Sequence, residues 1–424
     1  METAVDLLST STLSPATRRA TEVPDSDVTS GSAGLASRRS ESPSPIESPS
    51  PAEAPLPAGI VVPPARPAAD VQSEVRRDPF TGRLTLVAGQ RDRRPMEFVR
   101  RPVATNLTLD CPFCAGGEWM TPAAVHSEFA DGGSTASPRG DGRSSDWTVR
   151  VVPNRFPAVS PKRPGVVAPG PITGGPFQSA MAFGRHEVVI ESPRHRHSLS
   201  DLDVDEIRAT FRAYRSRLAD LRRDRTLRSV QIFKNVGPDA GASLSHSHSQ
   251  IIATNFLPDL TAGVVRRMRR HHAETGCCLR CEVLREEHSR GERIVAVVDG
   301  IACYCPHASR TPMAMRLTPI THAGCLTQLD PETLAALADL TRRSVGWMER
   351  VLGPVAYNVV VHVAPPNIPD SVGPIDDAYH LSIDITPRIT HIAGYELGSD
   401  VFINAVSPED AATRYRDAVA AESL

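Results

Sequence analysis

The chain has 424 residues, which allows two or three domains and a substantial core. Its hydrophobic fraction of 40% and charged fraction of 23% are ordinary for a globular protein. The formal net charge of −2 gives no support for binding to nucleic acid or to an anionic membrane, and no apolar run is long enough to span a membrane.

The first 72 residues predict a disordered tail. They hold 11 of the 38 prolines and contain no cysteine, histidine or aromatic residue. Such a composition cannot bury enough apolar surface to offset the entropy lost on ordering. The chain does not open with a basic segment followed by a long apolar stretch, so we expect no signal peptide and a cytoplasmic location.

Folded character begins near Val75, and strand and helix patterns then follow one another in the same order twice. In the first half, the expected strands are residues 83–88, 147–152, 186–190, 230–233 and 250–253, and the expected helix is residues 203–222. The apolar face of that helix consists of Ile207, Phe211, Tyr214, Leu218 and Leu221. In the second half, we expect strands at residues 314–317, 357–361 and 380–385, and a helix that begins at residues 330–332.

Two cysteines and two histidines recur in the same order in both halves, at equivalent places between the same elements. This self-similarity suggests two copies of one α+β unit. Two thiolates and two imidazoles form a closed tetrahedral zinc site. We predict one zinc at Cys111, Cys114, His195 and His246, and a second at Cys278, Cys281, His322 and His380. A redox pair or chance is the alternative, and the repeated order argues against it, more strongly for the first site.

His246, His248 and Gln250 would share one face of a strand. If His246 binds the metal, His248 lies beside it and is free to act as a nucleophile, since neutral imidazole near pH 7 attacks phosphorus and leaves readily. Gln250 would donate its amide to a phosphoryl oxygen. The alternatives are that both histidines bind metal, or that His248 is an ordinary surface residue.

The loop before this strand contains glycines and neutral hydrogen-bond donors. Gly237 and Gly241 permit close approach of the backbone to phosphate oxygens, and Asn235 and Ser243 supply polar side chains. Taken alone, this loop is equally compatible with a simple hairpin.

Together these residues resemble the active-site motif of the galactose-1-phosphate uridylyltransferase family, which belongs to the histidine triad superfamily. The resemblance spans about residues 75–420. Its segments are 78–82 through 91–95, Cys111–Cys114, Val152–Pro157, Ser192–His195, Phe233–Asn235, Gly241–Ser243, His246–Gln250 and Gly394–Glu396. It implies an α+β fold of two tandem histidine-triad-like units, each an antiparallel sheet with a packed helix. The catalytic unit would span residues 73–262, and the structural and sugar-site unit residues 263–424.

The resemblance also implies a ping-pong reaction, in which His248 takes the nucleotidyl group of a nucleotide sugar and passes it to a sugar phosphate. The implied phosphate contacts are Ser243, Gln250, Arg91 and Arg94, with the arginines acting across the interface of a homodimer. The implied nucleotide contacts are Asn154 and Asn235, and the implied sugar contacts are Tyr395 and Glu396. The resemblance thus implies a role in galactose and nucleotide-sugar metabolism.

The sequence departs from the best-known members in its second half. Ser382 stands where a second nucleophile would be, two cysteines join the second metal site, and Thr390 and His391 replace residues usually basic and apolar near the sugar. We therefore expect one active site per chain. Two other functions stay open: an ADP-sugar or dinucleotide phosphorylase, whose acceptor is inorganic phosphate, and a non-enzymatic zinc-scaffolded nucleotide-binding protein. A nucleic-acid repair relative finds no support in the charge balance.

Overall fold

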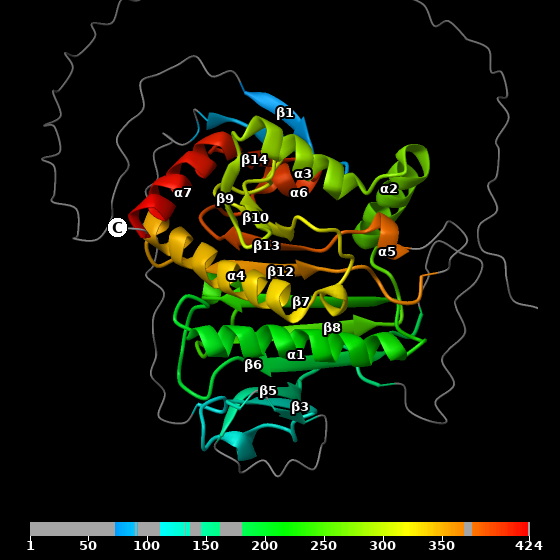
Figure 1. Ribbon diagram of the computed structural model, residues 1–424, viewed down its shortest axis with the longest axis vertical. Coiled ribbons are helices and arrows are strands. Elements are labelled where there is room, and N and C mark those ends of the chain that lie inside the picture. The colour runs from blue at the N-terminus through cyan, green and yellow to red at the C-terminus, as the bar shows by residue number, and fades with distance from the viewer. Residues whose placement is uncertain are drawn as a thin grey trace, which may run out of the picture. The chain divides into compact units, whose positions relative to one another are not determined.

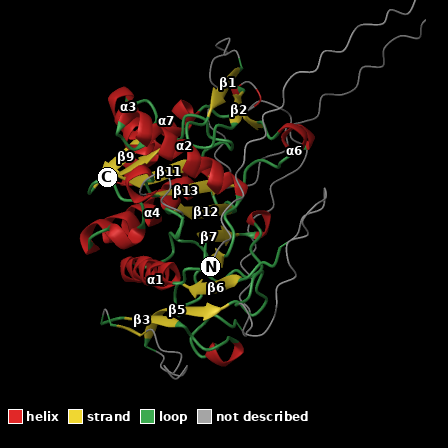
Figure 2. Cartoon of the chain, turned by 90° about the vertical axis from the view of Figure 1, so that its right-hand side faces the viewer, coloured by secondary structure: helices red, strands yellow, loops and turns green. Residues whose placement is uncertain are grey.

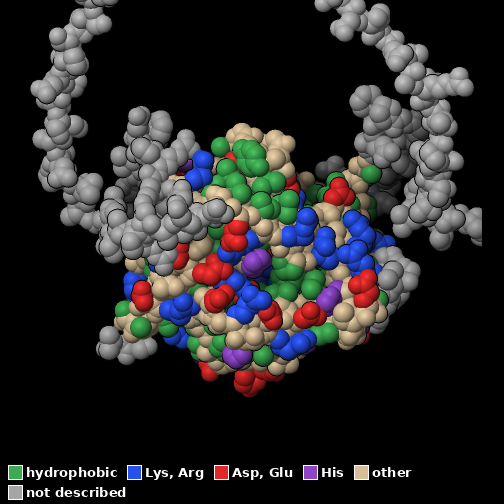
Figure 3. All heavy atoms as spheres, turned by 90° about the horizontal axis from the view of Figure 1, so that it is seen from above, with side chains coloured by type: hydrophobic (Ala, Val, Ile, Leu, Met, Phe, Trp, Pro, Cys, Tyr) green, Lys and Arg blue, Asp and Glu red, His purple; other side chains and the backbone are tan. Residues whose placement is uncertain are grey.

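The computed structural model describes residues 73–89, 91, 111–131, 133–135, 146–161, 180–368 and 375–422. The tail expected at residues 1–72 lies outside these ranges, as does Arg94. Within the described ranges, no helix is both long enough and apolar enough to cross a membrane. Figure 3 shows basic and acidic side chains interspersed on one face, in keeping with the small net charge.

Eleven of the described strands form one sheet in which every neighbouring pair is antiparallel. In spatial order they are β4 (Ser134–Thr135), β3 (His126–Phe129), β5 (Trp147–Pro153), β6 (Gly184–Ile190), β8 (His248–Thr254), β7 (Ser229–Val236), β12 (Tyr357–His362), β13 (Ser382–Pro387), β11 (Met315–Pro319), β10 (Ile301–Tyr304) and β9 (Ile294–Val298). A smaller sheet joins β1 (Glu74–Arg77), β2 (Leu84–Val87) and β14 (Phe402–Asn404), and β14 runs parallel to β2. The predicted α+β fold with an antiparallel sheet is confirmed.

The two halves of the large sheet mirror one another around the pair β7 and β12. Helix α1 (Val204–Arg223) connects β6 to β7, and helix α4 (Pro331–Leu352) connects β11 to β12. The two helices pack side by side against one face of the sheet (Figure 1, Figure 2). The main core lies between this face and the helices, and all five residues predicted for the apolar face of α1 are buried there.

Both long helices begin with side-chain caps. A carboxylate oxygen of Glu206 accepts from the backbone N–H of Asp203 in α1, and Asp330 accepts from the N–H of Thr333 in α4. Pro331 occupies the first turn of α4, as predicted. Shorter helices complete the fold: η2 (Glu118–Met120), η3 (Pro238–Ala240), α2 (Asp259–Thr275), α3 (Leu279–Arg290), η4 (Leu326–Gln328), α5 (Ile375–Ala378), α6 (Gly394–Ser399) and α7 (Pro408–Glu422).

The structure corrects two strand boundaries that matter for the site. Strand β8 begins at His248, so His246 lies just before the strand rather than on it. Strand β13 begins at Ser382, so His380 likewise precedes its strand. Each histidine thus leaves the regular pleat, which frees its side chain to turn toward a cysteine pair. The division proposed at residue 262 stays a prediction; that position lies within α2.

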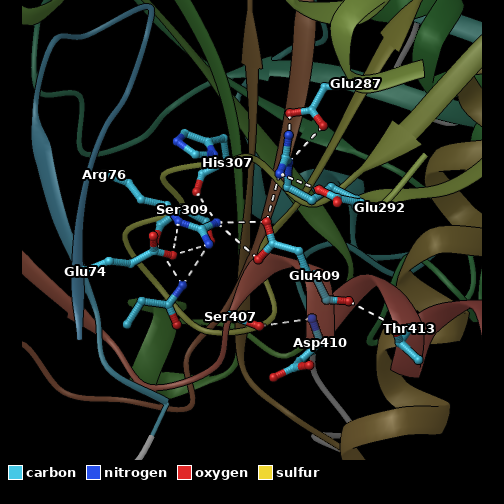
Figure 4. Close-up of polar contacts among 12 residues, drawn as sticks. Glu74, Arg76, Glu287, Glu292, His307, Ser309, Ser407, Glu409, Asp410 and Thr413 are labelled. Carbon is cyan, nitrogen blue, oxygen red and sulfur yellow. Dashed lines mark hydrogen bonds and ion pairs between the residues drawn. The ribbon is translucent and has the colours of Figure 1, made fainter. Parts of the chain in front are cut away.

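An ion-pair network joins the first described strand to the last helix (Figure 4). Arg76 of β1 contacts Glu409 of α7 at 2.9 Å, and Arg293 contacts the same carboxylate at 2.8 Å. Arg293 also pairs with buried Glu287 at 2.8 Å. Burial opposes ionisation of Glu409, but its bonds to the two arginines hold its pKa below the ordinary value. The network therefore stabilises the fold while Glu409 is ionised.

We expect Glu409→Gln to lower the free energy of unfolding at pH 7 by about 1–3 kcal/mol, because two charge-assisted contacts are weakened. Since the folded-state pKa of Glu409 is depressed, its contribution is present above the unfolded-state pKa and is lost as pH falls through the folded value. Urea unfolding at several pH values measures this. Glu286→Gln, in an exposed pair with Arg290, is the control and should change stability by less than about 1 kcal/mol. An equal effect of both variants at pH 7 would contradict the prediction.

Candidate active site and metal centres

Four predicted metal ligands meet at one end of the first half. The ligand atoms of Cys111, Cys114, His195 and His246 all lie within 4.8 Å of one another. The Cys111 sulfur is 3.4 Å from Nδ1 of His246, and the Cys114 sulfur is 3.4 Å from Nδ1 of His195. Tetrahedral zinc with ordinary bond lengths would place sulfur and nitrogen about 3.6 Å apart. The site therefore fits a small tetrahedral ion.

Hydrogen bonds and charges around this first cluster favour the binding of a metal ion by its residues. Nε2 of His246 is 2.9 Å from the carbonyl of Ser192, so the ring donates there and presents a bare Nδ1 to the cluster. Burial and the neighbouring Cys111 raise the pKa of the Cys114 thiol to about 11. Two adjacent thiolates thus require a bound cation, which is what a metal would supply.

The second predicted cluster has the same construction. The ligand atoms of Cys278, Cys281, His322 and His380 also lie within 4.8 Å of one another. The Cys281 sulfur is 3.4 Å from Nδ1 of His322 and 3.3 Å from Nδ1 of His380. Nε2 of His322 donates to the carbonyl of Asp376 at 2.8 Å. The chain therefore brings together both sets of residues that the repeated order indicated.

His248 is held with one ring nitrogen available for chemistry. It is buried, and its Nδ1 donates to the carbonyl of His246 at 2.7 Å, so the lone pair of the neutral ring is on Nε2. Burial and the nearby Lys234 ammonium lower the pKa of His248 and favour this neutral form. Phe113, from the turn between the two cysteines, packs against the ring with centroids 5.3 Å apart. The arrangement suits a nucleophile of fixed orientation.

Gln250 and the predicted nucleotide contacts lie in the first half. The Gln250 side-chain oxygen is 2.8 Å from Nε2 of His186, a residue of β6 that was not predicted as part of the site. Asn154 follows β5, and its side-chain nitrogen is 3.1 Å from the same ring atom. The sequence showed only that His186 begins an expected strand. Its contact with Gln250 depends on the register between β6 and β8, which the sequence alone does not give.

The second half also reaches this site. Asn358 of β12 lies opposite Asn235 of β7, and its side chain donates to the Asn235 oxygen at 2.8 Å and to the carbonyl of Ala240 at 3.0 Å. Asn358 was missed because the contact depends on how the two halves pair. Gly241 ends η3 with a φ of +86°, a conformation that favours glycine. This glycine turns the chain back toward β8.

Comparison with known proteins agrees with this geometry. Residues 141–258 match the family described as galactose-1-phosphate uridyl transferase, N-terminal domain. The chain is 29% identical to the ADP-glucose phosphorylase of Arabidopsis thaliana, over 81% of this chain and 92% of that protein. It is 25% identical to the galactose-1-phosphate uridylyltransferase of Thermotoga maritima, over 81% and 98%. The crystal structure of the Arabidopsis thaliana phosphorylase with bound ADP-glucose aligns with a TM-score of 0.65 and 27% identity, covering 82% of this chain and 99% of that one.

The chain is thus similar, along most of its length, to an ADP-glucose phosphorylase and to galactose-1-phosphate uridylyltransferases. The remaining predicted contacts are either exposed or lie away from His248. Ser243 is exposed on the loop before β8. Arg91 is exposed, and Tyr395 and Glu396 lie on α6, which contacts β14 beside the second half and is remote from β8 (Figure 1). A single chain therefore does not bring the predicted sugar contacts to His248.

The second half has a guanidinium near the position equivalent to His248. Ser382 begins β13 as His248 begins β8, and its side chain is too short to fill the same space. Nε of Arg280 instead donates to the carbonyl of His380 at 3.1 Å, the bond that His248 makes to His246 in the first half. The ring of Phe80 lies 4.1 Å from the Arg280 guanidinium. The second half therefore presents no imidazole at the equivalent position.

A buried ion pair supports the backbone around His248 from the helix side. Lys234 contacts Glu191 and Ser247 at 2.5 and 2.8 Å and donates to the carbonyl of His248 at 3.1 Å. Burial opposes ionisation of Glu191, but the charge of Lys234 and its hydrogen bonds lower the pKa of Glu191 below the ordinary value. The other Glu191 oxygen accepts from Tyr214 at 3.2 Å. This network fixes the segment that carries both histidines.

We expect Lys234→Met to lower the free energy of unfolding by about 3–5 kcal/mol, because it leaves the buried Glu191 carboxylate without its cation. Urea unfolding measures the loss. The double variant Glu191→Gln with Lys234→Met should recover part of it, since the unpaired charge is then removed. Arg290→Met, which breaks an exposed pair, serves as the control and should cost less than about 1 kcal/mol. A Lys234→Met protein as stable as the control would refute this reading.

Proposed function

We propose that the protein transfers a nucleoside monophosphate from a nucleotide sugar through a covalent intermediate on His248, as a hexose-1-phosphate uridylyltransferase does. The bare Nε2 of His248, fixed by the Nδ1 bond to His246, carries this proposal. In the first step, Nε2 attacks the α-phosphorus, a P–N bond forms, and the P–O bond to the sugar phosphate breaks. In the second step, a phosphate oxygen of the acceptor attacks the same phosphorus and releases the imidazole.

The neighbouring residues have matching roles in this proposal. Gln250 donates its amide to a non-bridging oxygen as charge develops there. Asn154 and Asn235 contact the nucleotide, while Ser243 and the backbone at Gly241 contact the phosphates. Tyr395 and Glu396 recognise the sugar, and Arg91 and Arg94 bind phosphate. Because Tyr395 and Glu396 lie away from His248 in one chain, we propose a homodimer in which the partner supplies them.

The covalent step is tested by trapping. The protein is incubated with α-³²P-labelled UDP-glucose or ADP-glucose, denatured and analysed for alkali-stable, acid-labile label. We expect labelled wild-type protein, no label on His248→Ala, and retained label on His197→Ala, a control at another histidine near the cluster. Label of equal amount on His248→Ala would exclude His248 as the nucleophile.

A second candidate is an ADP-sugar phosphorylase, in which inorganic phosphate is the acceptor. It is favoured by the similarity to the Arabidopsis thaliana ADP-glucose phosphorylase along most of both chains. The two candidates share the first step and differ in the nucleobase of the donor and in the second substrate. Release of ADP from ADP-glucose that depends on phosphate would identify the phosphorylase. Exchange of labelled glucose 1-phosphate into UDP-glucose would identify the uridylyltransferase.

We propose zinc as the metal of both clusters, because two cysteines and two histidines at these separations form its usual structural site. Such an ion, when bound, neutralises the thiolates and holds the turn of Cys111 and Cys114 against His246. Metal analysis should find about two zinc ions per chain, and Cys111→Ser and Cys278→Ser should each remove about one. Cys277→Ser, beside the second cluster but outside it, should keep both. Full metal content in the Cys278→Ser protein would exclude the second site.

A further inference from the structure

His186 lies between the predicted nucleotide contacts and Gln250. It belongs to β6, opposite Ile252 of β8, so it is the diagonal neighbour of Gln250 on the sheet face away from α1. Its Nδ1 is 3.0 Å from the backbone nitrogen of Ala158, and its Nε2 is 2.8 Å from the side-chain oxygen of Gln250. One imidazole therefore spans the turn after β5 and the proposed phosphoryl-contacting side chain.

The contact with Ala158 fixes the protonation of this ring. A backbone N–H can only donate, so Nδ1 of His186 must carry the lone pair. The neutral ring then bears its proton on Nε2 and must donate to whichever Gln250 atom faces it. That atom is consequently the carbonyl oxygen, and the structure places this oxygen 2.8 Å from Nε2.

The same reasoning identifies the side-chain atom of Asn154 that faces His186. Its side-chain oxygen accepts from the backbone N–H of Phe156 at 2.8 Å, so its nitrogen is the atom near His186. Nitrogen of an amide and Nε2–H of this tautomer are both donors, so their 3.1 Å approach is a contact and not a hydrogen bond. The Asn154 amide hydrogens are thus left for another acceptor.

Fixing the Gln250 carbonyl also fixes its amide. The two ends of a glutamine amide are nearly equal in size, and only a hydrogen-bond partner selects between the two orientations. With its oxygen held by His186, Gln250 directs its N–H₂ group away from His186. An amide turned the other way would present an oxygen to a phosphoryl group, and two acceptors repel.

We propose that His186 is a positioning residue for nucleotidyl transfer, which holds the Gln250 carbonyl so that the amide donates to the phosphoryl oxygen. This inference rests on the function proposed above. The same ring also accepts from the backbone N–H of Ala158, in the turn that follows the predicted nucleotide contact Asn154.

Two substitutions separate the two ring nitrogens. Asparagine at 186 can place an oxygen near the Nδ1 position and accept from Ala158, but it is too short to reach Gln250. Glutamine can place an N–H near the Nε2 position and donate to Gln250. We expect His186→Asn to slow single-turnover labelling from α-³²P UDP-glucose or ADP-glucose by about tenfold or more, since Gln250 regains its rotational freedom. His186→Gln should stay within a few-fold of wild type, and the dissociation constant of the nucleotide sugar should change little in either.

The decisive measurement is the double variant with Gln250→Met, which fills the same space without an amide. Gln250→Met alone should lose about 10²–10³-fold in rate. His186→Asn should cost nothing further in that background if it acts through Gln250. Additive losses, a His186→Asn rate equal to wild type, or metal loss and a lowered melting temperature in both His186 variants would overturn the inference. No label on wild-type protein from either nucleotide sugar would instead refute the proposed function.

Discussion

The antiparallel pairing of β7 with β12 is the contact on which the rest of the molecule depends. Each half contributes its own strands, helix and cysteine–histidine cluster, but neither half closes its sheet at this edge. Pairing Ser229–Val236 with Tyr357–His362 covers both edges and places α1 and α4 side by side on one face. It also sets Asn358 against Asn235, so the second half completes the polar surroundings of the first.

The sequence predicted the two cysteine–histidine clusters better than the residues that surround them. Cysteines and histidines are rare enough that their repeated order identified both clusters without knowledge of the fold. His186 and Asn358 could not be found in this way, because their roles depend on strand register and on the pairing of two distant strands. Helices α2 and α3 were also missed. Helix α3 buries Arg280 and Glu287 while exposing much of its remaining length, so its pattern does not show a clear apolar face.

The two halves show how one unit serves two purposes. Both keep a metal cluster, and in both the histidine before the strand offers its carbonyl to a nitrogen donor. In the first half that donor is His248, whose other nitrogen stays bare; in the second it is Arg280, stacked on Phe80. The ion pairs of the two halves also differ. In the first half, Lys234 forms a buried pair with Glu191, whereas in the second half Arg316 pairs with Asp384 on β13.

The link between Arg76 and Glu409 has a consequence for how the protein is made. These partners are 333 residues apart in the chain, and β2 likewise finds β14 only near the end of the sequence. During synthesis, β1 and β2 are made long before Glu409 and β14, so they have no such partners while the intervening strands form the large sheet. Closing so long a loop is entropically costly, so this joint is expected among the last to form. The first and last described elements are therefore expected to join after the large sheet, with its two cysteine–histidine clusters, has formed.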